Sequence, residues 1–369
     1  DGVTPLAMAA ENGDIALTRM LVGRGANTSL VDGSGRTLVD VAEAAGQEEM
    51  AQFLRILDVH TAARHGDMAA VQAALDTGVD PDTNHHLTGS TLLCAAINSG
   101  MLEMVQLLLE AKSNPNLVAM TGFSPLYTAA NRGKLDVLQV LLDAKASVNA
   151  QIVTGCFPLF GALRCKARAQ ATIPALLAAK ANVRLESTAG LTALWVALRR
   201  RVCPEVVEML LEKKASATHV NKKGDTALHL MVTRAKRVEP SLRLIELKCS
   251  VNISNRKTGR TPLHVASGIK RGLETVQALL EAKASVNQLD NFQAGALHVA
   301  LAASCGDRVQ QLLDAQAEVG GSVQLGDLRT TALHLAAARD FPEVVVTTLL
   351  ERKAKINTRA VGLTPILAA

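Results

Sequence analysis

Apolar residues recur along the chain in short helix-spaced blocks, and these blocks repeat about every 34 residues. In each unit a first apolar block follows a Thr or Ser, a short turn leads to a second block, and a polar loop ends the unit. The pattern is clearest in residues 121–149 (TGFSPLYTAANRGKLDVLQVLLDAKASVN) and 258–287 (TGRTPLHVASGIKRGLETVQALLEAKASVN). It predicts pairs of short helices separated by loops.

The residue that precedes the first block of each unit fixes the register. These residues are Thr4, Thr37, Leu57, Thr91, Ser124, Phe157, Thr192, Thr226, Thr261, Gly295, Thr331 and Thr364. Their spacing is 33 to 36 residues, except for one step of 20 between Thr37 and Leu57. There the second unit runs into the third without a loop, and a missing loop breaks regular stacking.

We therefore expect a joint near Leu57. It would separate an N-terminal subarray of two repeats, residues 1–57, from a main array, residues 58–369, that is truncated in its last repeat. The chain starts in a loop and stops halfway through a first helix, whereas a solenoid needs polar caps at both ends. We accordingly expect an excerpt of a longer polypeptide.

Several positions within the unit have a mechanical explanation. Thr or Ser before Pro suits a helix N-cap followed by the first helical position. Gly13, Gly100 and Gly133 suit the left-handed turn that ends the first helix. Lysines in the last turn of the second helix complement the helix dipole, and we expect no site there. They are Lys112, Lys145, Lys213, Lys283 and Lys353.

Three of the units carry a more specific motif: TPLHVA at 261–266, TALHLM at 226–231 and TALHLAA at 331–337, with a recurring LL-x-A-K-A-S-V-N tail. The chain resembles ankyrin-repeat proteins over essentially its whole length, as about eleven helix pairs and part of a twelfth. The resemblance implies an all-α fold, an ankyrin-repeat solenoid of stacked helix–turn–helix units with hairpin or loop fingers. It also implies a concave groove that binds other proteins, and no catalytic activity.

Composition agrees with thin, closely packed helices, because hydrophobic residues make up 48% of the chain and aromatic residues only 2%. The net charge of +5 argues against a nucleic-acid-binding protein as a whole. The six cysteines form no CxxC pair, which predicts free thiols in a reducing compartment. No apolar run reaches the ~18 to 20 residues of a membrane span, and no signal segment opens the chain. We expect a cytoplasmic protein, with the nucleus as the alternative.

Candidate catalytic and metal-binding residues are few. Four histidines occupy the fourth place of the TPLH-like motif, and the resemblance gives them a structural role: His229, His264, His298 and His334. His85 and His86 have no Cys or acidic partner at ligand spacing, so we expect no metal site. HExxH, GxSxG, Walker and GxGxxG motifs are absent. We expect no enzyme, no cofactor and no small-molecule substrate.

The strongest candidate site is basic. In the sixth to ninth repeats the turn between the two helices is longer than in the fifth, and the turn carries Lys and Arg with no Asp or Glu inside any cluster. The eleven residues are Arg164, Lys166, Arg168, Arg199, Arg200, Arg201, Arg234, Lys236, Arg237, Lys270 and Arg271. Stacked helices lie roughly 8 to 10 Å apart, so these turns would form a ridge on the order of 30 Å long. Solvated loops that happen to be basic are the alternative.

Arginine forks onto carboxylates and phosphates, so the ridge predicts an anionic partner. An acidic or phosphorylated segment of a partner protein fits best, and an anionic membrane surface with inositol-lipid headgroups is an alternative. Nucleic acid is less favoured, because we expect Trp195 and Phe160 to be buried rather than available for base stacking. Two other functions stay open: a targeting or substrate-recruiting region of a larger enzyme or channel, and a spacer without a specific ligand.

Overall fold

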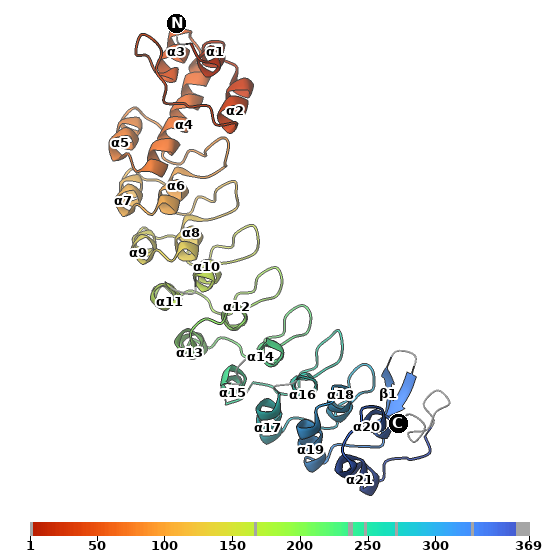
Figure 1. The fold of residues 1–369 in the computed structure, drawn as a ribbon. Coiled ribbons are helices and arrows are strands. Elements are labelled where there is room, and N and C mark those ends of the chain that lie inside the picture. Colours follow the sequence, from red (N-terminus) through yellow and green to blue (C-terminus); the bar gives the residue numbers. More distant parts are fainter. Residues whose placement is uncertain are drawn as a thin grey trace. The chain divides into compact units, whose positions relative to one another are not determined.

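The structure is a computed structural model that describes residues 3–165, 168–234, 239–246, 249–269, 272–325 and 328–358. The chain divides into two compact units, residues 1–188 and residues 189–369. Within each unit, antiparallel helix pairs stack side by side and long loops connect one pair to the next (Figure 1). The fold is therefore an all-α solenoid, as the sequence predicts.

The described part of the first unit contains eleven helices. They are α1 (Pro5–Glu11), α2 (Ile15–Gly23), α3 (Leu38–Ala44), α4 (Glu48–His65), α5 (Met68–Asp76), α6 (Leu92–Ser99), α7 (Leu102–Glu110), α8 (Pro125–Arg132), α9 (Leu135–Asp143), α10 (Pro158–Arg164) and α11 (Ala169–Ala178). First helices pack on first helices in the order α1, α3, α4, α6, α8 and α10. Second helices α7, α9 and α11 form the other layer.

The described part of the second unit continues the same pattern. Its helices are α12 (Ala193–Arg200), α13 (Pro204–Glu212), α14 (Ala227–Arg234), α15 (Glu239–Glu246), α16 (Pro262–Ser267), α17 (Leu273–Glu281), α18 (Ala296–Ala302), α19 (Gly306–Asp314), α20 (Ala332–Ala338) and α21 (Glu343–Glu351). A hairpin of β1 (Ser322–Leu325) and β2 (Leu328–Thr331) forms the finger before α20, with Ser322 opposite Thr331. The partial twelfth repeat around Thr364 lies outside the described residues.

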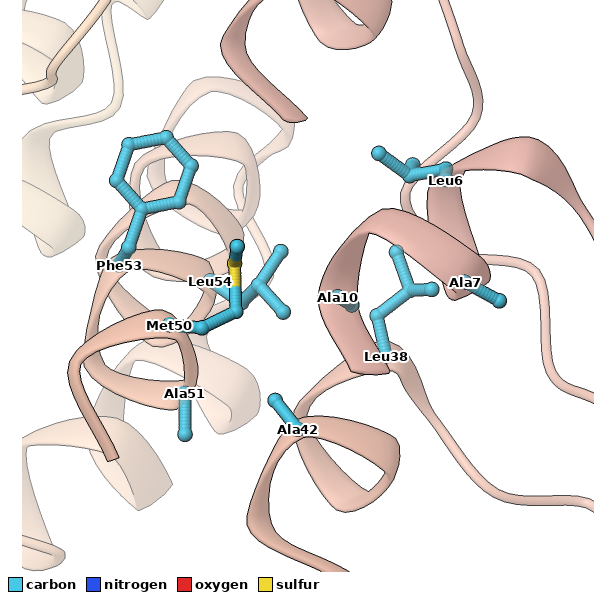
Figure 2. Close-up of a cluster of buried hydrophobic side chains, with 9 residues drawn as sticks. All are labelled: Leu6, Ala7, Ala10, Leu38, Ala42, Met50, Ala51, Phe53 and Leu54. Atoms are coloured by element: carbon cyan, nitrogen blue, oxygen red, sulfur yellow. The ribbon is translucent and has the colours of Figure 1, made fainter. Parts of the chain in front are cut away.

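Small side chains let neighbouring helices approach closely. In the cluster drawn in Figure 2, Ala7 and Ala10 of α1 and Ala42 of α3 alternate with larger residues such as Leu54 of α4. Each Leu buried in such a layer contributes roughly 2 kcal/mol of hydrophobic stabilisation. A chain poor in aromatic residues can therefore still form a continuous dry layer.

Helix α4 explains the short step in the repeat register. Its eighteen residues serve as the second helix of the second repeat and the first helix of the third. The joint expected at Leu57 falls inside this continuous helix, and the compact units meet at residues 188 and 189. A division of the protein at residue 57 stays a prediction.

The predicted helix boundaries have the expected chemistry. The hydroxyl of Thr4 accepts a hydrogen bond from the Ala7 amide, and the hydroxyl of Ser124 accepts one from the Tyr127 amide. Gly100 and Gly133 end their helices in the left-handed conformation, with φ of 81° and 66°. The local sequence thus sets where first helices begin and end.

The recurring lysines lie differently from the prediction. Lys145 and its equivalents stand just beyond the second helix, in left-handed conformations with φ of 61° to 65°, rather than in the last helical turn. The Ala146 amide closes the turn on the Leu141 carbonyl, a Schellman-type pattern. In the seventh repeat Lys214, not Lys213, occupies this position. The lysines remain close enough to the helix end to complement its dipole.

Asparagines of the tail motif join successive repeats. The side-chain oxygen of Asn149 accepts a hydrogen bond from the Asn182 amide at 2.8 Å, and its side-chain nitrogen donates to the Lys180 carbonyl at 3.4 Å. Asn116 and Asn287 each make the same two bonds to the following repeat. Asn therefore fixes the register between neighbours, a role that Ala could not fill.

Candidate partner-binding surface

The described basic residues of the predicted ridge stand where first helices end. Arg164 is the last residue of α10, Arg199 and Arg200 lie in the last turn of α12, and Arg201 is its C-cap. All four side chains are exposed. Positive charge at a helix C-terminus is favourable in itself, so part of this arrangement serves the helices.

Arg201 is held in an unusual backbone conformation. Its φ of 55° is left-handed, at the place where α6 and α8 end with Gly100 and Gly133. A non-glycine residue there costs about 1 kcal/mol relative to its preferred conformation. Ser304 and Asp340 take the same conformation in the turns after α18 and α20, with φ of 54° and 51°, so this cost is also met by residues outside the basic cluster.

Arg199 is positioned by an aromatic ring. Its guanidinium carbon lies 5.8 Å from the centroid of the Trp195 ring, one helical turn earlier in α12. Trp195 is 8% exposed, as expected from the sequence, so the ring is a buried support rather than a stacking platform for bases. The cation–π contact restricts the Arg199 guanidinium to the neighbourhood of this ring.

Only part of the eighth and ninth repeats can be placed. Arg234 is the last residue of α14, which packs beside α12, so the backbones of Arg200 and Arg234 end neighbouring first helices. Lys166, Lys236, Arg237, Lys270 and Arg271 lie outside the described residues. Whether all eleven residues form one ridge stays a prediction.

The basic turn of the sixth repeat stacks on the turn before it. A Cβ added to Gly133 would lie 2.7 Å from the Cβ of Arg168 and 2.8 Å from the sulfur of Cys165. The guanidinium of Arg168 donates to the Arg132 carbonyl at 3.4 Å. Lys134 approaches Gly100 in the same way, and so does Met101 with Gly66. Within the first unit, equivalent turns therefore lie in register.

Turn length itself is a weaker signal than the sequence indicates. Two residues separate α8 from α9, whereas four separate α10 from α11 and three separate α12 from α13. The turns between α18 and α19 and between α20 and α21 are also longer, at three and four residues, yet they carry no cluster of basic residues. Long turns therefore do not by themselves mark a binding site.

Two arginines that the sequence analysis missed lie in the first unit. Arg64 is in the last turn of α4 and Arg132 ends α8, and the Nε of Arg132 donates to the side-chain oxygen of Asn98 on α6 at 3.2 Å. Arg64 is the seventh residue after Leu57, and Arg132 is the eighth after Ser124. Arg199 and Arg200 stand at the same two positions of their repeat, so all four belong to one column of the repeat alignment. That column was the signal that could have revealed them.

Arg64 and Arg132 line a groove of about 830 Å³ between first helices and fingers. Its base includes Ala95 and Asn98 of α6, and its finger side includes Thr88 and Phe123. No Asp or Glu is among the lining residues. The groove is therefore basic and rich in hydrogen-bonding side chains.

The motif histidines are structural. The Nδ1 of His229 pairs with the Thr226 hydroxyl at 2.8 Å, and its Nε2 lies 2.9 Å from the Arg260 carbonyl in the next repeat. His264 makes the equivalent bonds with Thr261 and the Ala294 carbonyl. Burial lowers the pKa of both imidazoles, which keeps them neutral and able to bond in this way.

His60 is a further member of this set that the sequence analysis did not recognise, because helix α4 replaces the usual helix start. Its Nε2 lies 3.2 Å from the Thr83 carbonyl, and burial lowers its pKa to about 4. His85 accepts hydrogen bonds from the Leu87 and Thr88 amides, and His86 stacks on Phe53. Among the residues that the structure describes, no group of three or more His, Cys, Asp or Glu could hold a metal ion.

The state of the cysteines and the ability of the helices to span a membrane can both be read from the structure. The six cysteines all lie in the described part of the chain and none is in a disulfide. Burial raises the pKa of Cys249 to about 11, so its thiol is protonated and unreactive at neutral pH. In the described part of the chain, every helix is too short or too polar to cross a bilayer.

Stacked helix–turn–helix pairs with fingers, a Thr–His contact repeated at the helix starts and asparagine bridges between repeats define a repeat solenoid. A model of ankyrin repeats in three copies matches residues 59–152 and 241–323, and the single ankyrin-repeat model matches residues 1–33. These matches cover more than half of the chain. The chain belongs to the ankyrin-repeat family, whose repeats form protein-interaction domains.

Three relatives and one solved structure give the degree of similarity. Rabankyrin-5 of Mus musculus and of Homo sapiens are each 29% identical over 153 residues, 42% of this chain and 13% of theirs. The B-cell lymphoma 3 protein homolog of Mus musculus is 33% identical over 178 residues, 46% of this chain and 38% of its own. The crystal structure of the human ASB11 ankyrin repeat domain is 28% identical, with a TM-score of 0.52, over 62% of this chain and 99% of that domain. The chain thus spans a minor part of each curated relative.

Proposed function

We propose that this chain is a noncatalytic scaffold that holds a partner protein between its first helices and fingers. Basic residues at the ends of the first helices recognise an acidic or phosphorylated segment of that partner. The observation that carries the proposal is the exposure of three consecutive arginines at the end of α12, of which Arg201 is the C-cap. It follows Arg199 and Arg200 directly, so three positively charged residues lie at one helix end.

The chemistry supports a partner protein over the other anions. Guanidinium groups bind carboxylates and phosphates through paired hydrogen bonds, and the aromatic neighbour Trp195 is buried, which disfavours stacking with bases. The six free cysteines support a cytoplasmic location, with the nucleus as the alternative. A recruiting role for a longer enzyme or channel is a second candidate, favoured by the much greater length of the matched relatives.

The test is a binding measurement on an array of acidic and phosphorylated peptides at two salt concentrations. Changing Arg199, Arg200 and Arg201 together to Ser is expected to weaken binding of the best peptide about tenfold or more, since each exposed charge pair contributes about 0.5 to 1 kcal/mol. Raising the salt from 50 mM to 500 mM is expected to weaken binding of the unchanged chain as well.

The matched control removes the same number of charges elsewhere. Changing Lys180, Lys283 and Lys353 to Gly keeps the left-handed turns that these residues occupy and is expected to leave the affinity within about twofold. Equal losses in the two variants would show that only net charge matters. Binding that withstands high salt and the loss of the three arginines would contradict the proposal.

A further inference from the structure

The groove of the first unit offers a second charged surface that the sequence pattern did not reveal. Arg64 and Arg132 are both exposed at its rim. Among the described residues, neither guanidinium forms an ion pair with a carboxylate, and no acidic side chain lines the groove. In the described part of the chain, both guanidinium groups therefore line the groove without a carboxylate partner, although Arg132 also donates a hydrogen bond to Asn98.

The two histidines in the groove do not add to this charge at neutral pH. Burial lowers the pKa of His60 to about 4, and burial together with Arg64 lowers the pKa of His85. Their rings pack edge to face at 5.1 Å and form part of the wall. The positive potential therefore comes from the two arginines alone, two repeats apart.

The opposite wall supplies an apolar contact. Phe123, on the finger before α8, is 39% exposed, and its ring stacks on the ring of Tyr127 at 5.5 Å between centroids. Because Tyr127 is buried, the stack is supported from below and Phe123 presents one face. An aliphatic or aromatic side chain of a partner can cover that face.

The polar lining distinguishes between a helix and an extended peptide as the occupant. Asn98, Asn131 and Thr121 bring amide and hydroxyl groups to the groove, in addition to the arginines. A helix already satisfies its own backbone, whereas an extended peptide needs partners for its N–H and C=O groups. This lining therefore favours an extended segment.

Stacking distance sets the spacing of the acidic side chains that would fit. Arg64 belongs to the third repeat and Arg132 to the fifth. With roughly 8 to 10 Å between neighbouring helices, the arginines are roughly 16 to 20 Å apart. An extended chain advances about 3.3 Å per residue, so this span corresponds to about five or six residues.

Building on the proposed function, we infer that this groove binds an extended acidic segment of a partner protein. Two acidic side chains about five or six residues apart contact Arg64 and Arg132, and an apolar side chain between them covers Phe123. The site is separate from the three arginines of α12, since it lies wholly in the first unit.

The experiment uses fluorescence anisotropy with the full chain and a labelled eight-residue peptide. The peptide carries glutamates at positions one and seven, leucine at position five, and serines elsewhere. Arg64→Ser and Arg132→Ser are each expected to weaken binding about three- to fivefold, and Phe123→Ser about as much. A second peptide carries the two glutamates next to each other. It is expected to bind the unchanged chain about as weakly as the first peptide binds Arg64→Ser or Arg132→Ser.

Matched controls lie in the same unit. Arg24→Ser removes a charge that is also exposed, in the first repeat. Met120→Ser removes an apolar side chain that is 80% exposed on the same finger as Phe123. Both are expected to leave the affinity within about twofold. Comparable losses in these controls, or equal binding of the two glutamate spacings, would overturn the inference.

The same peptide separates this inference from the proposed function. The variant lacking Arg199, Arg200 and Arg201 is expected to bind it normally, because those residues lie in the other unit. Loss of binding in that variant, but not in Arg64→Ser, would overturn the groove and leave the proposed arginine cluster standing. Tighter binding of single-stranded RNA or phosphoinositide vesicles than of the peptide, with the same dependence on Arg64, would also overturn it.

Discussion

Arg201 is the residue at which the backbone preference and the proposed binding role make opposite demands. Its left-handed φ of 55° suits glycine, and glycine does occupy the equivalent positions in α6 and α8. The lysines after the second helices also have a left-handed φ. Most of them follow an acidic residue two positions earlier, as in LLEAK and LLDAK. The arginine cluster has no acidic residue between Arg199 and Arg201, and the next one along the chain is Glu205.

Arg201→Gly is expected to raise the free energy of unfolding by about 0.5 kcal/mol, since relief of strain slightly outweighs the added flexibility of the unfolded chain. Arg200→Gly, one residue earlier and inside α12, is expected to lower it by about 1 kcal/mol. Urea unfolding of both variants measures the difference. Destabilisation of similar size in both would contradict the assigned conformation.

At the scale of single elements, α4 shows the consequence of deleting a finger. Asp58 occupies the place that Pro holds after the capping residue in TPLH, but the helix runs through it without a start. Burial in this setting raises the pKa of the Asp58 carboxyl to about 6. An Asp is favourable near a helix N-terminus, but here it lies in the interior of a helix. Desolvation makes its charged form unfavourable there.

Asp58→Asn is expected to stabilise the chain by about 1 kcal/mol at pH 7.5. This is less than the free energy that corresponds to the full pKa shift, because the carboxyl keeps some solvent contact. The folded-state pKa lies above the unfolded value of 3.8, so the folded chain binds more protons between the two. The advantage of Asn should therefore be greatest above pH 6 and disappear as the pH falls to 4. Thermal unfolding across this range tests it; an advantage independent of pH would exclude the carboxyl as the cause.

At the scale of the whole molecule, stability depends on coupling between neighbouring repeats, because each repeat buries its apolar surface only against the next. The asparagine bridges belong to this coupling. Asn149 connects its own loop to the turn that contains Lys180 and Asn182. The contact lies within the first unit and joins residues more than thirty positions apart in sequence.

Asn149→Ala is expected to lower the free energy of unfolding by about 1 kcal/mol and to broaden the urea transition, because it removes two bonds between repeats. Asn27→Ala is the control, since in the part of the chain that the structure describes the Asn27 side chain bonds only to Ser29, two residues away. Its effect is expected to stay below about 0.5 kcal/mol. Equal effects of the two changes would show that the bridge carries no coupling.

The sequence by itself determined the repeat, the two-helix unit and most helix starts, because caps, left-handed glycines and apolar spacing act within a few residues of one another. It placed Arg199, Arg200 and Arg201 in the turn between two helices, whereas Arg199 and Arg200 lie in the last turn of α12 and Arg201 follows as its C-cap. It also overestimated turn length as a signal, which α18 to α21 show by having long turns without basic clusters.

Only the tertiary structure decided which distant side chains meet. Arg64, Asn98 and Arg132 become one rim, and His60 becomes a bridging histidine, because repeats stack so that residues about 34 positions apart are neighbours. Fusion of two helices into α4 hid the motif around His60 from a search for helix starts. Helix caps, turn glycines and apolar spacing act within one repeat and can be recognised in the sequence. A groove depends on several repeats packing together, which only the tertiary structure shows.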